Sequence, residues 1–247
     1  MAKRYIILDT ETTGTSEEDR VIQLGFMVLG AKQPEVHNEF FSSDIPIKFG
    51  AMEVHGITQE MIDGKPSIKE SLSYNRLQEL NTNDNYMIIH NAPFDLGMLA
   101  KEGFNAKMKV IDTLRVAKHI YKDEEAHRLQ YFRYKMGLYK DEQKEANELG
   151  IEVKAHDAIG DVLVLKLFLS KLRASVQKIF PDENPVDKMV DLTNTPILID
   201  KFRFGKYKGK TLREVAHEDA GYLRWMLSSM DNLDNDMRYS LQSVLES

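Results

Sequence analysis

The sequence has 247 residues, of which 42% are hydrophobic and 29% charged, with a formal net charge of −6 and no cysteine. These proportions are typical of a soluble globular protein with one large domain or two smaller ones. The lack of cysteine excludes disulfides and thiolate chemistry. The negative net charge argues against a surface that is basic throughout, although it allows a nuclease with local basic groups.

The N-terminal residues lead directly into the first expected strand and lack the apolar core of a signal peptide. No apolar stretch approaches the length needed to cross a membrane. We therefore expect a cytoplasmic protein that does not bind membranes.

Apolar runs and turn residues predict an α/β domain over residues 1–175, with a mixed sheet flanked by helices. An antiparallel meander comes first, and later strands alternate with helices. Residues 176–196 are rich in proline and polar residues, which predicts a linker. Residues 197–247 are expected to form a small C-terminal α+β domain.

Two acidic residues, Asp9 and Glu11, follow the first expected strand, residues 4–8. Positions i and i+2 of a strand share one face, so both carboxylates point into one small volume. Like charges this close need a proton or a cation between them, and hard oxygen ligands suit Mg²⁺ or Mn²⁺. The alternative is an acidic strand end that is simply exposed to water.

Further candidates lie at the starts of two expected helices. Asp95 opens a helix after a short strand that ends near Asn91, where parallel sheets present ligand-binding residues. His156 and Asp161 are about 140° apart on a regular helix, so we expect the helix to begin at Asp157, with His156 just before it as a general base. Taken singly, these residues could also be a helix cap, a surface histidine and a solvated acid.

Jointly, these residues resemble the three motifs of the DnaQ-like 3′–5′ exonucleases, in the DEDDh branch that has histidine in its third motif. Asp9-Thr10-Glu11 matches the first motif, Asn91-x-x-Phe94-Asp95 the second and His156-x-x-x-x-Asp161 the third. The resemblance implies an RNase H-like fold and hydrolysis of phosphodiester bonds with two Mg²⁺ (or Mn²⁺) ions.

The same resemblance assigns roles to the acidic residues and the histidine. Asp9 would bridge both ions, Glu11 and Asp161 would hold the one that carries the attacking water, and Asp95 would support the other. His156 would deprotonate that water. Substrate-binding candidates are Thr10, Thr12, Thr13, His55, Asn91 and Phe94, although the favoured interpretation of His55 is a structural turn histidine.

Basic and aromatic residues alternate near the C-terminus. The aromatic residues are Phe202, Phe204 and Tyr207, and the possible DNA-binding residues are Lys201, Arg203, Lys206, Lys208 and Lys210. This composition is typical of single-strand binding, but a β-hairpin with its aromatic residues in a small core explains it as well. The segment is similar to the C-terminal extension of the exodeoxyribonuclease X branch of the family.

The expected function is a metal-dependent 3′–5′ exodeoxyribonuclease that releases nucleoside 5′-monophosphates from DNA 3′ ends, single-stranded or duplex, in DNA repair. Alternatives are a proofreading subunit like polymerase III epsilon or an exonuclease that trims RNA. A further alternative is an RNase H-like module that binds nucleic acid without catalysis.

Overall fold

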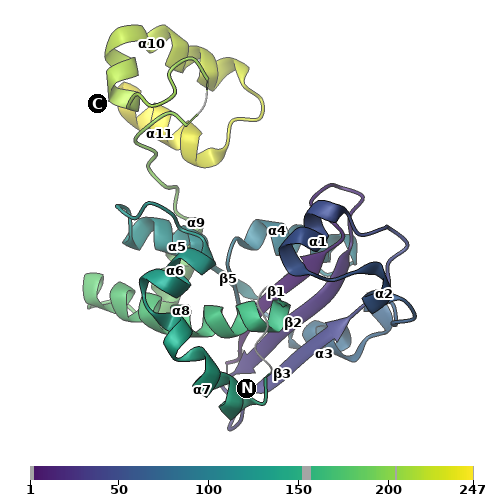
Figure 1. Cartoon of the computed structure of the whole chain (residues 1–247). Coiled ribbons are helices and arrows are strands. Elements are labelled where there is room, and N and C mark those ends of the chain that lie inside the picture. The colour runs from purple at the N-terminus through teal and green to yellow at the C-terminus, as the bar shows by residue number, and fades with distance from the viewer. Residues whose placement is uncertain (1–2, 152–156, 204, 247) are drawn as a thin grey trace. The chain divides into compact units, whose positions relative to one another are not determined.

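The computed structural model describes residues 3–151, 157–203 and 205–246 (Figure 1). The chain divides into two compact units, an N-terminal unit (Met1–Thr193) and a C-terminal unit (Asn194–Ser247). In the described residues, the N-terminal unit contains a five-stranded sheet with helices on both faces, and the C-terminal unit contains two helices preceded by a loop.

The elements of the N-terminal unit begin with three consecutive strands. The strands are β1 (Tyr5–Thr12), β2 (Val21–Leu29), β3 (Glu35–Phe40), β4 (Tyr86–Ile89) and β5 (Lys109–Asp112). The helices are α1 (Phe49–His55), α2 (Gln59–Ile62), α3 (Leu72–Leu80), α4 (Ala92–Lys101), α5 (Thr113–Ile120), α6 (Leu129–Lys135), α7 (Glu142–Leu149), α8 (Ala158–Ile179) and α9 (Pro185–Asn194), with short 3₁₀ turns η1 (Ile68–Glu70) and η2 (Leu138–Lys140). The C-terminal unit holds α10 (Leu212–Ser229) and α11 (Asn235–Glu246).

The strand order in the sheet is β3-β2-β1-β4-β5. β1, β2 and β3 pair antiparallel, whereas β1, β4 and β5 pair parallel. This mixed sheet confirms the predicted meander followed by parallel strands.

Alternate side chains of β1 enter two different hydrophobic cores. Ile7 belongs to the core beneath α5 to α9, and Ile6 belongs to the core beneath α3 and α4. Because successive residues of a strand point to opposite faces, Asp9 and Glu11 continue the row of Ile7 on the α8 side. Thr10 continues the row of Ile6 on the α4 side. The two faces therefore receive different functional groups.

β1 is longer than the sequence indicated. We expected the strand to end before the acidic residues, but it continues through them to Thr12, because β2 pairs with it up to that residue. β4 pairs only with Tyr5–Ile7 of β1. The acidic half of β1 therefore extends past β4, and this leaves its edge free to meet the start of α4.

The predicted linker over residues 176–196 is wrong for most of its length. α8 extends to Ile179, and residues 185–194 form α9. Met189 and Leu192 of α9 are buried in the core on the α8 side of the sheet. Proline and polar residues suggested a linker, but Pro185 instead occupies the first position of a helix, which proline tolerates.

The C-terminal unit has its own core, formed by α10, α11 and the loop before them. In the described part of this loop, the expected hairpin is reduced to one antiparallel bridge between Lys201 and Thr211. Two backbone hydrogen bonds, from Phe202 N to Lys210 O and from Gly209 N to Phe202 O, close the loop further. Phe202 is buried in the core, as the hairpin interpretation required of it.

No helix in the described ranges has both the length and the apolar composition needed to cross a membrane.

Candidate active site

Three carboxylates converge on the α8 face of the sheet. One oxygen from each of Asp9, Glu11 and Asp161 lies within 4.8 Å of the others. Asp9 and Glu11 come from β1, and Asp161 comes from the first turn of α8, about 150 residues later in the chain. Three oxygen donors this close are a suitable set of ligands for a hard divalent cation.

The surroundings of these carboxylates oppose their negative charge. Burial, together with the charges of Asp95, Asp161 and Glu11, raises the pKa of Asp9 well above its usual value. Burial and the neighbouring acids likewise raise the pKa of Glu11 to about 8. Without a cation the cluster therefore retains protons at neutral pH, and a bound cation would remove this penalty.

Asp95 lies in the first turn of α4, outside the group of three, but its charge contributes to the raised pKa of both Asp9 and Glu11. Its Oδ1 accepts hydrogen bonds from Thr10 N at 3.0 Å and Thr10 Oγ1 at 2.7 Å. Burial raises the pKa of Asp95 to about 7, while the two bonds from Thr10 act in the opposite direction. Thr10 thus fixes the orientation of Asp95 and favours its ionised form.

Two residues of β2 that the sequence analysis missed set the position of α8. Gly25 lies opposite Asp9 in the sheet, and a Cβ at Gly25 would come within 2.7 Å of the backbone of Ala158 and Ile159. Only glycine lets the helix start this close to the strand. A glycine within an otherwise bulky strand was the signal that could have identified this contact.

Gln23 is the second of these residues, and it lies opposite Glu11 in the sheet. It is fully buried, and its Nε2 donates to Asn38 Oδ1 at 2.9 Å and to the carboxylate of Asp157. Its Oε1 accepts from Ala158 N at 3.3 Å. Gln23 therefore binds both the cap residue of α8, Asp157, and the amide of its first residue, Ala158. Ala158 lies three residues before Asp161.

Gln130 of α6 donates from Nε2 to Asp161 Oδ1 at 2.7 Å. This hydrogen bond orients the carboxylate of Asp161 from a second helix. Sequence patterns gave no sign of this contact, because α6 was not among the expected helices.

The hydroxyls of the predicted substrate-binding threonines form hydrogen bonds within the protein. The Thr10 hydroxyl donates to Asp95, that of Thr12 donates to Gly14 O at 2.7 Å, and that of Thr13 donates to Asp19 Oδ1 at 2.9 Å. All three side chains are buried. Their hydroxyls therefore stabilise the strand end through hydrogen bonds within the protein.

The other predicted substrate-binding residues lie around the same strand end. His55 Nδ1 accepts from Ile57 N at 3.0 Å, and His55 Nε2 lies 3.2 Å from Thr12 O, so both ring nitrogens already have partners. Asn91 is exposed and adopts φ 76°, a left-handed conformation that asparagine tolerates in the turn before α4. Phe94 is half-buried against the core beneath α4. The predicted general base His156, and also Phe204, lie outside the described residues.

The acidic loop after β1 is less negative than its sequence suggests. Asp19 is fully buried and accepts from Lys48 Nζ at 2.7 Å, from Ser16 N at 2.7 Å and from Thr13 Oγ1 at 2.9 Å. These bonds lower the pKa of Asp19 against the effect of burial. Asp19 therefore stabilises the loop as an ionised residue, in contrast to Asp9 and Asp95.

Two of the predicted DNA-binding lysines form ion pairs within the C-terminal unit. Lys206 Nζ lies 3.2 Å from Asp219 Oδ2, and Lys210 pairs with Glu218. Lys206 also lies over the rings of Tyr207 and Tyr222. Their positive charges are thus partly neutralised by α10. Lys201, Arg203 and Lys208 are exposed on the same loop.

The chain matches the family model described as Exonuclease over residues 6–168, and the model described as Exodeoxyribonuclease X-like C-terminal over residues 202–230. It is 26% identical over 245 residues to Exodeoxyribonuclease 10 of Escherichia coli (strain K12), covering 97% of this chain and 98% of that protein. It is 35% identical over 134 residues to DNA polymerase III subunit epsilon of Haemophilus influenzae, covering 48% of this chain and 51% of that protein.

Solved structures show the same fold. A structure of Exonuclease X in complex with 5′ overhanging duplex DNA superposes with a TM-score of 0.52 at 21% identity, covering 77% of this chain and 99% of that one. E. coli Exonuclease I in complex with a dT13 oligonucleotide gives a TM-score of 0.52 at 19% identity, covering 73% of this chain and 43% of that one. The RNase H-like exonuclease fold predicted from the sequence is therefore confirmed.

Proposed function

The chain belongs to the exonuclease family, and we propose that it is a metal-dependent 3′–5′ exodeoxyribonuclease that removes nucleoside 5′-monophosphates from DNA 3′ ends. The observation that carries this proposal is the convergence of Asp9, Glu11 and Asp161 from two distant parts of the chain. Exodeoxyribonuclease 10 of Escherichia coli is a relative that this chain matches over nearly its whole length. A role in DNA repair is consistent with such an activity.

The carboxylate cluster fits divalent cations of the Mg²⁺ or Mn²⁺ class. Its donors are carboxylate oxygens, their raised pKa values are consistent with unbalanced negative charge, and the sequence has no cysteine to supply a thiolate ligand. We propose that Asp9, Glu11 and Asp161 hold one ion and that Asp9 and Asp95 support a second. Two such ions supply positive charge that stabilises the attacking and leaving oxygens of the phosphodiester.

The chain's own residues prepare this site before substrate arrives. Gly25 and Gln23 fix the start of α8, Gln130 orients Asp161, and the two hydrogen bonds from Thr10 hold Asp95. Groups held in place in this way need little reorganisation during the reaction. We propose that His156, which directly precedes the cap residue of α8, accepts the proton of the attacking water.

The second candidate function is a proofreading exonuclease subunit, which the match to polymerase III subunit epsilon favours. That match covers about half of this chain, whereas the match to Exodeoxyribonuclease 10 extends through the C-terminal unit. An RNA-trimming enzyme would use the same carboxylates. The full-length match therefore favours the free-standing DNA enzyme.

The proposal is tested by incubating 5′-labelled DNA and RNA oligomers of equal sequence with the protein in Mg²⁺, Mn²⁺ or EDTA. We expect a ladder of products that shorten from the 3′ end, with DNA as the better substrate and no products in EDTA. Asp9→Asn and His156→Ala should abolish the ladder. Asp84→Asn, which changes an exposed acid at the opposite end of the sheet, should leave it unchanged.

Cleavage that survives Asp9→Asn would refute the carboxylate assignment. Better cleavage of RNA would support the RNA-trimming alternative. A lack of cleavage of either polymer in every metal would leave an RNase H-like binding module.

A further inference from the structure

We propose that a basic hollow between α10 and α11 in the C-terminal unit binds the phosphodiester backbone of single-stranded DNA through Arg213, His217 and Arg224. The inference rests on the proposed nuclease function for the identity of the polymer. It moves the binding surface away from Lys206 and Lys210, which the sequence pattern had indicated.

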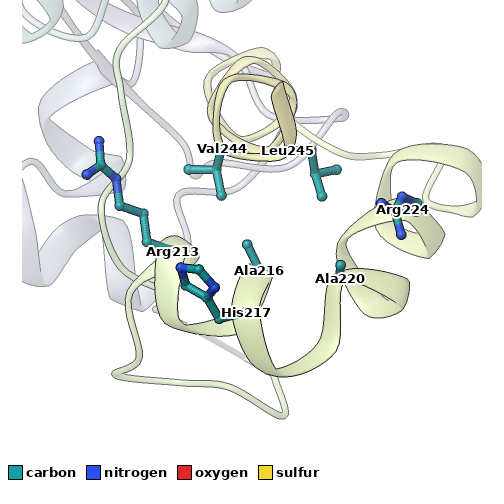
Figure 2. A pocket seen from close by; sticks show the side chains of 7 residues that line it. All are labelled: Arg213, Ala216, His217, Ala220, Arg224, Val244 and Leu245. Atoms are coloured by element: carbon teal, nitrogen blue, oxygen red, sulfur yellow. The ribbon is translucent and has the colours of Figure 1, made fainter. Parts of the chain in front are cut away.

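The hollow has a volume of about 420 Å³. Figure 2 shows Val244 and Leu245 of α11 pointing toward Ala216 and Ala220 of α10. Arg213 lies at one end of this apolar floor and Arg224 at the other, with His217 between them along α10. The small alanine side chains leave space between the helices, and Arg213 and Arg224 both line this hollow.

The acidic residues of α10 are held by the preceding loop and not by these arginines. Glu214 accepts from Thr211 N and Oγ1, at 2.7 and 2.8 Å, and Glu218 pairs with Lys210. Asp219 accepts from Tyr207 at 2.7 Å and Lys206 at 3.2 Å. Glu218 and Asp219 thus have lysine partners on the loop, and Glu214 is bound by the helix cap.

Arg213, His217 and Arg224 are all exposed. Within the described part of the chain, none of them has an ion pair or a side-chain hydrogen bond. Two permanent positive charges that have no partner among the described residues, spaced along one side of a hollow, match a ligand with repeated negative charges. Arginine is also the side chain best suited to bidentate contacts with phosphate oxygens.

A binding site here would raise the local concentration of a strand near the catalytic unit, because both units belong to one chain. Such a site would act on oligomers long enough to engage both units. Sequence readout is not expected, because phosphate contacts carry no base information.

The test measures binding of the full chain to a fluorescent single-stranded dT oligomer in EDTA, over a range of salt concentrations. An oligomer of about 20 nucleotides is long enough, because one small binding fold covers roughly 4–16 nucleotides. The double variant Arg213→Gln/Arg224→Gln should weaken binding at least about tenfold at low salt. It should also reduce the slope of log K against log salt by about 1.4, since each lost phosphate contact contributes about 0.7 for a single strand. Arg213→Lys/Arg224→Lys should retain most of the slope.

Two control variants make the same change in net charge. Lys32→Gln/Lys107→Gln alters exposed lysines of the N-terminal unit, at the opposite end of the sheet from the carboxylates. It should change affinity less than about twofold, since neither lysine lines the hollow or the carboxylate cluster and exposed charges are screened by salt. Lys206→Gln/Lys210→Gln removes lysines that are already paired and should have a smaller effect than the arginine variant. Thermal unfolding checks that each variant is folded.

Unchanged affinity and salt slope in a folded Arg213→Gln/Arg224→Gln protein would overturn the proposal, and so would a larger effect of Lys206→Gln/Lys210→Gln. Because binding is measured in EDTA, its outcome is independent of hydrolysis. Cleavage with unchanged binding in the arginine variant would refute only this inference, whereas binding without cleavage in any metal would refute only the proposed nuclease function.

Discussion

Gly25 and Ala158 lie so close together that no side chain fits between β2 and the start of α8: a Cβ on Gly25 would lie 2.7 Å from the Ala158 carbonyl carbon and 2.9 Å from its Cβ. Gly25 is opposite Asp9 in the sheet, and Ala158 is three residues before Asp161. This contact therefore determines how near Asp161 comes to the carboxylates of β1.

Gly25→Ala should push the start of α8 away from the sheet. We expect a loss of about 1–3 kcal/mol in the free energy of unfolding from overpacking, and a fall of about 100-fold in metal-dependent cleavage if Asp161 moves by 1 Å. The matched control is Gly97→Ala, since a Cβ there meets no atom within 4 Å. Urea unfolding and cleavage assays on both variants measure these effects. Equal stability and equal cleavage rates in Gly25→Ala and Gly97→Ala would contradict the prediction.

Replacing Asp9 and replacing Asp19 by asparagine should change the free energy of unfolding in opposite directions. Asp9 lies among other acids, so Asp9→Asn should raise the free energy of unfolding of the metal-free protein by about 1 kcal/mol, the equivalent of roughly one pKa unit of relieved repulsion. Asp19 is bound by Lys48 and Thr13, so Asp19→Asn should lower it by about 1–3 kcal/mol. Denaturant unfolding at pH 8 in EDTA distinguishes them, and destabilisation by both would argue against repulsion at Asp9.

The stability of the metal-free protein should fall as pH rises. Glu11 and Asp95 have pKa values of about 8 and about 7 in the folded protein, above the values of about 4.3 and 3.9 expected in the unfolded chain. Between these limits the folded protein holds more protons than the unfolded one, so raising the pH from about 4 to about 8 favours unfolding.

A divalent cation should reverse this dependence, because it binds the deprotonated carboxylates. We therefore expect Mg²⁺ to raise the melting temperature more at pH 8 than at pH 5. Thermal unfolding in EDTA and in Mg²⁺ across this range measures the difference. If Mg²⁺ raised the melting temperature by the same amount at every pH, the cation would bind outside the carboxylate cluster.

Thr10 should act on the reaction through Asp95. Thr10→Val removes the 2.7 Å bond from Oγ1 while keeping the shape of the side chain. Because that bond lowers the pKa of Asp95, its loss should move the acidic limb of the pH–rate profile to higher pH and reduce cleavage. Thr10→Ser should restore the wild-type profile. A reduced rate with an unshifted profile in Thr10→Val would indicate a role that does not involve Asp95 ionisation.

Much of the fold followed from local pattern. Apolar runs of strand length predicted β1, β2 and β4, and helical spacing predicted the first half of α8. Alternation along a strand was enough to predict that Asp9 and Glu11 share a face. These inferences succeed because each depends on residues that are close in sequence.

The sequence pattern gave a wrong prediction, or none, where a distant partner decided the outcome. α9 replaces part of the predicted linker because Met189 and Leu192 find a hydrophobic core to enter. The acidic loop after β1 contains a buried ionised residue because Lys48 reaches Asp19. Neither partner can be recognised from composition alone.

The sequence by itself determined the kinds of groups in the candidate site and, through local periodicity, which of them share a face. Only the tertiary structure decided how they meet: Gly25 sets the approach of α8, Thr10 holds Asp95, and α10 neutralises Lys206 and Lys210 while leaving Arg213 and Arg224 free of protein partners in the described residues. The physical reason is that periodicity is a property of neighbouring residues, whereas register, helix approach and ion pairing depend on residues brought together by packing.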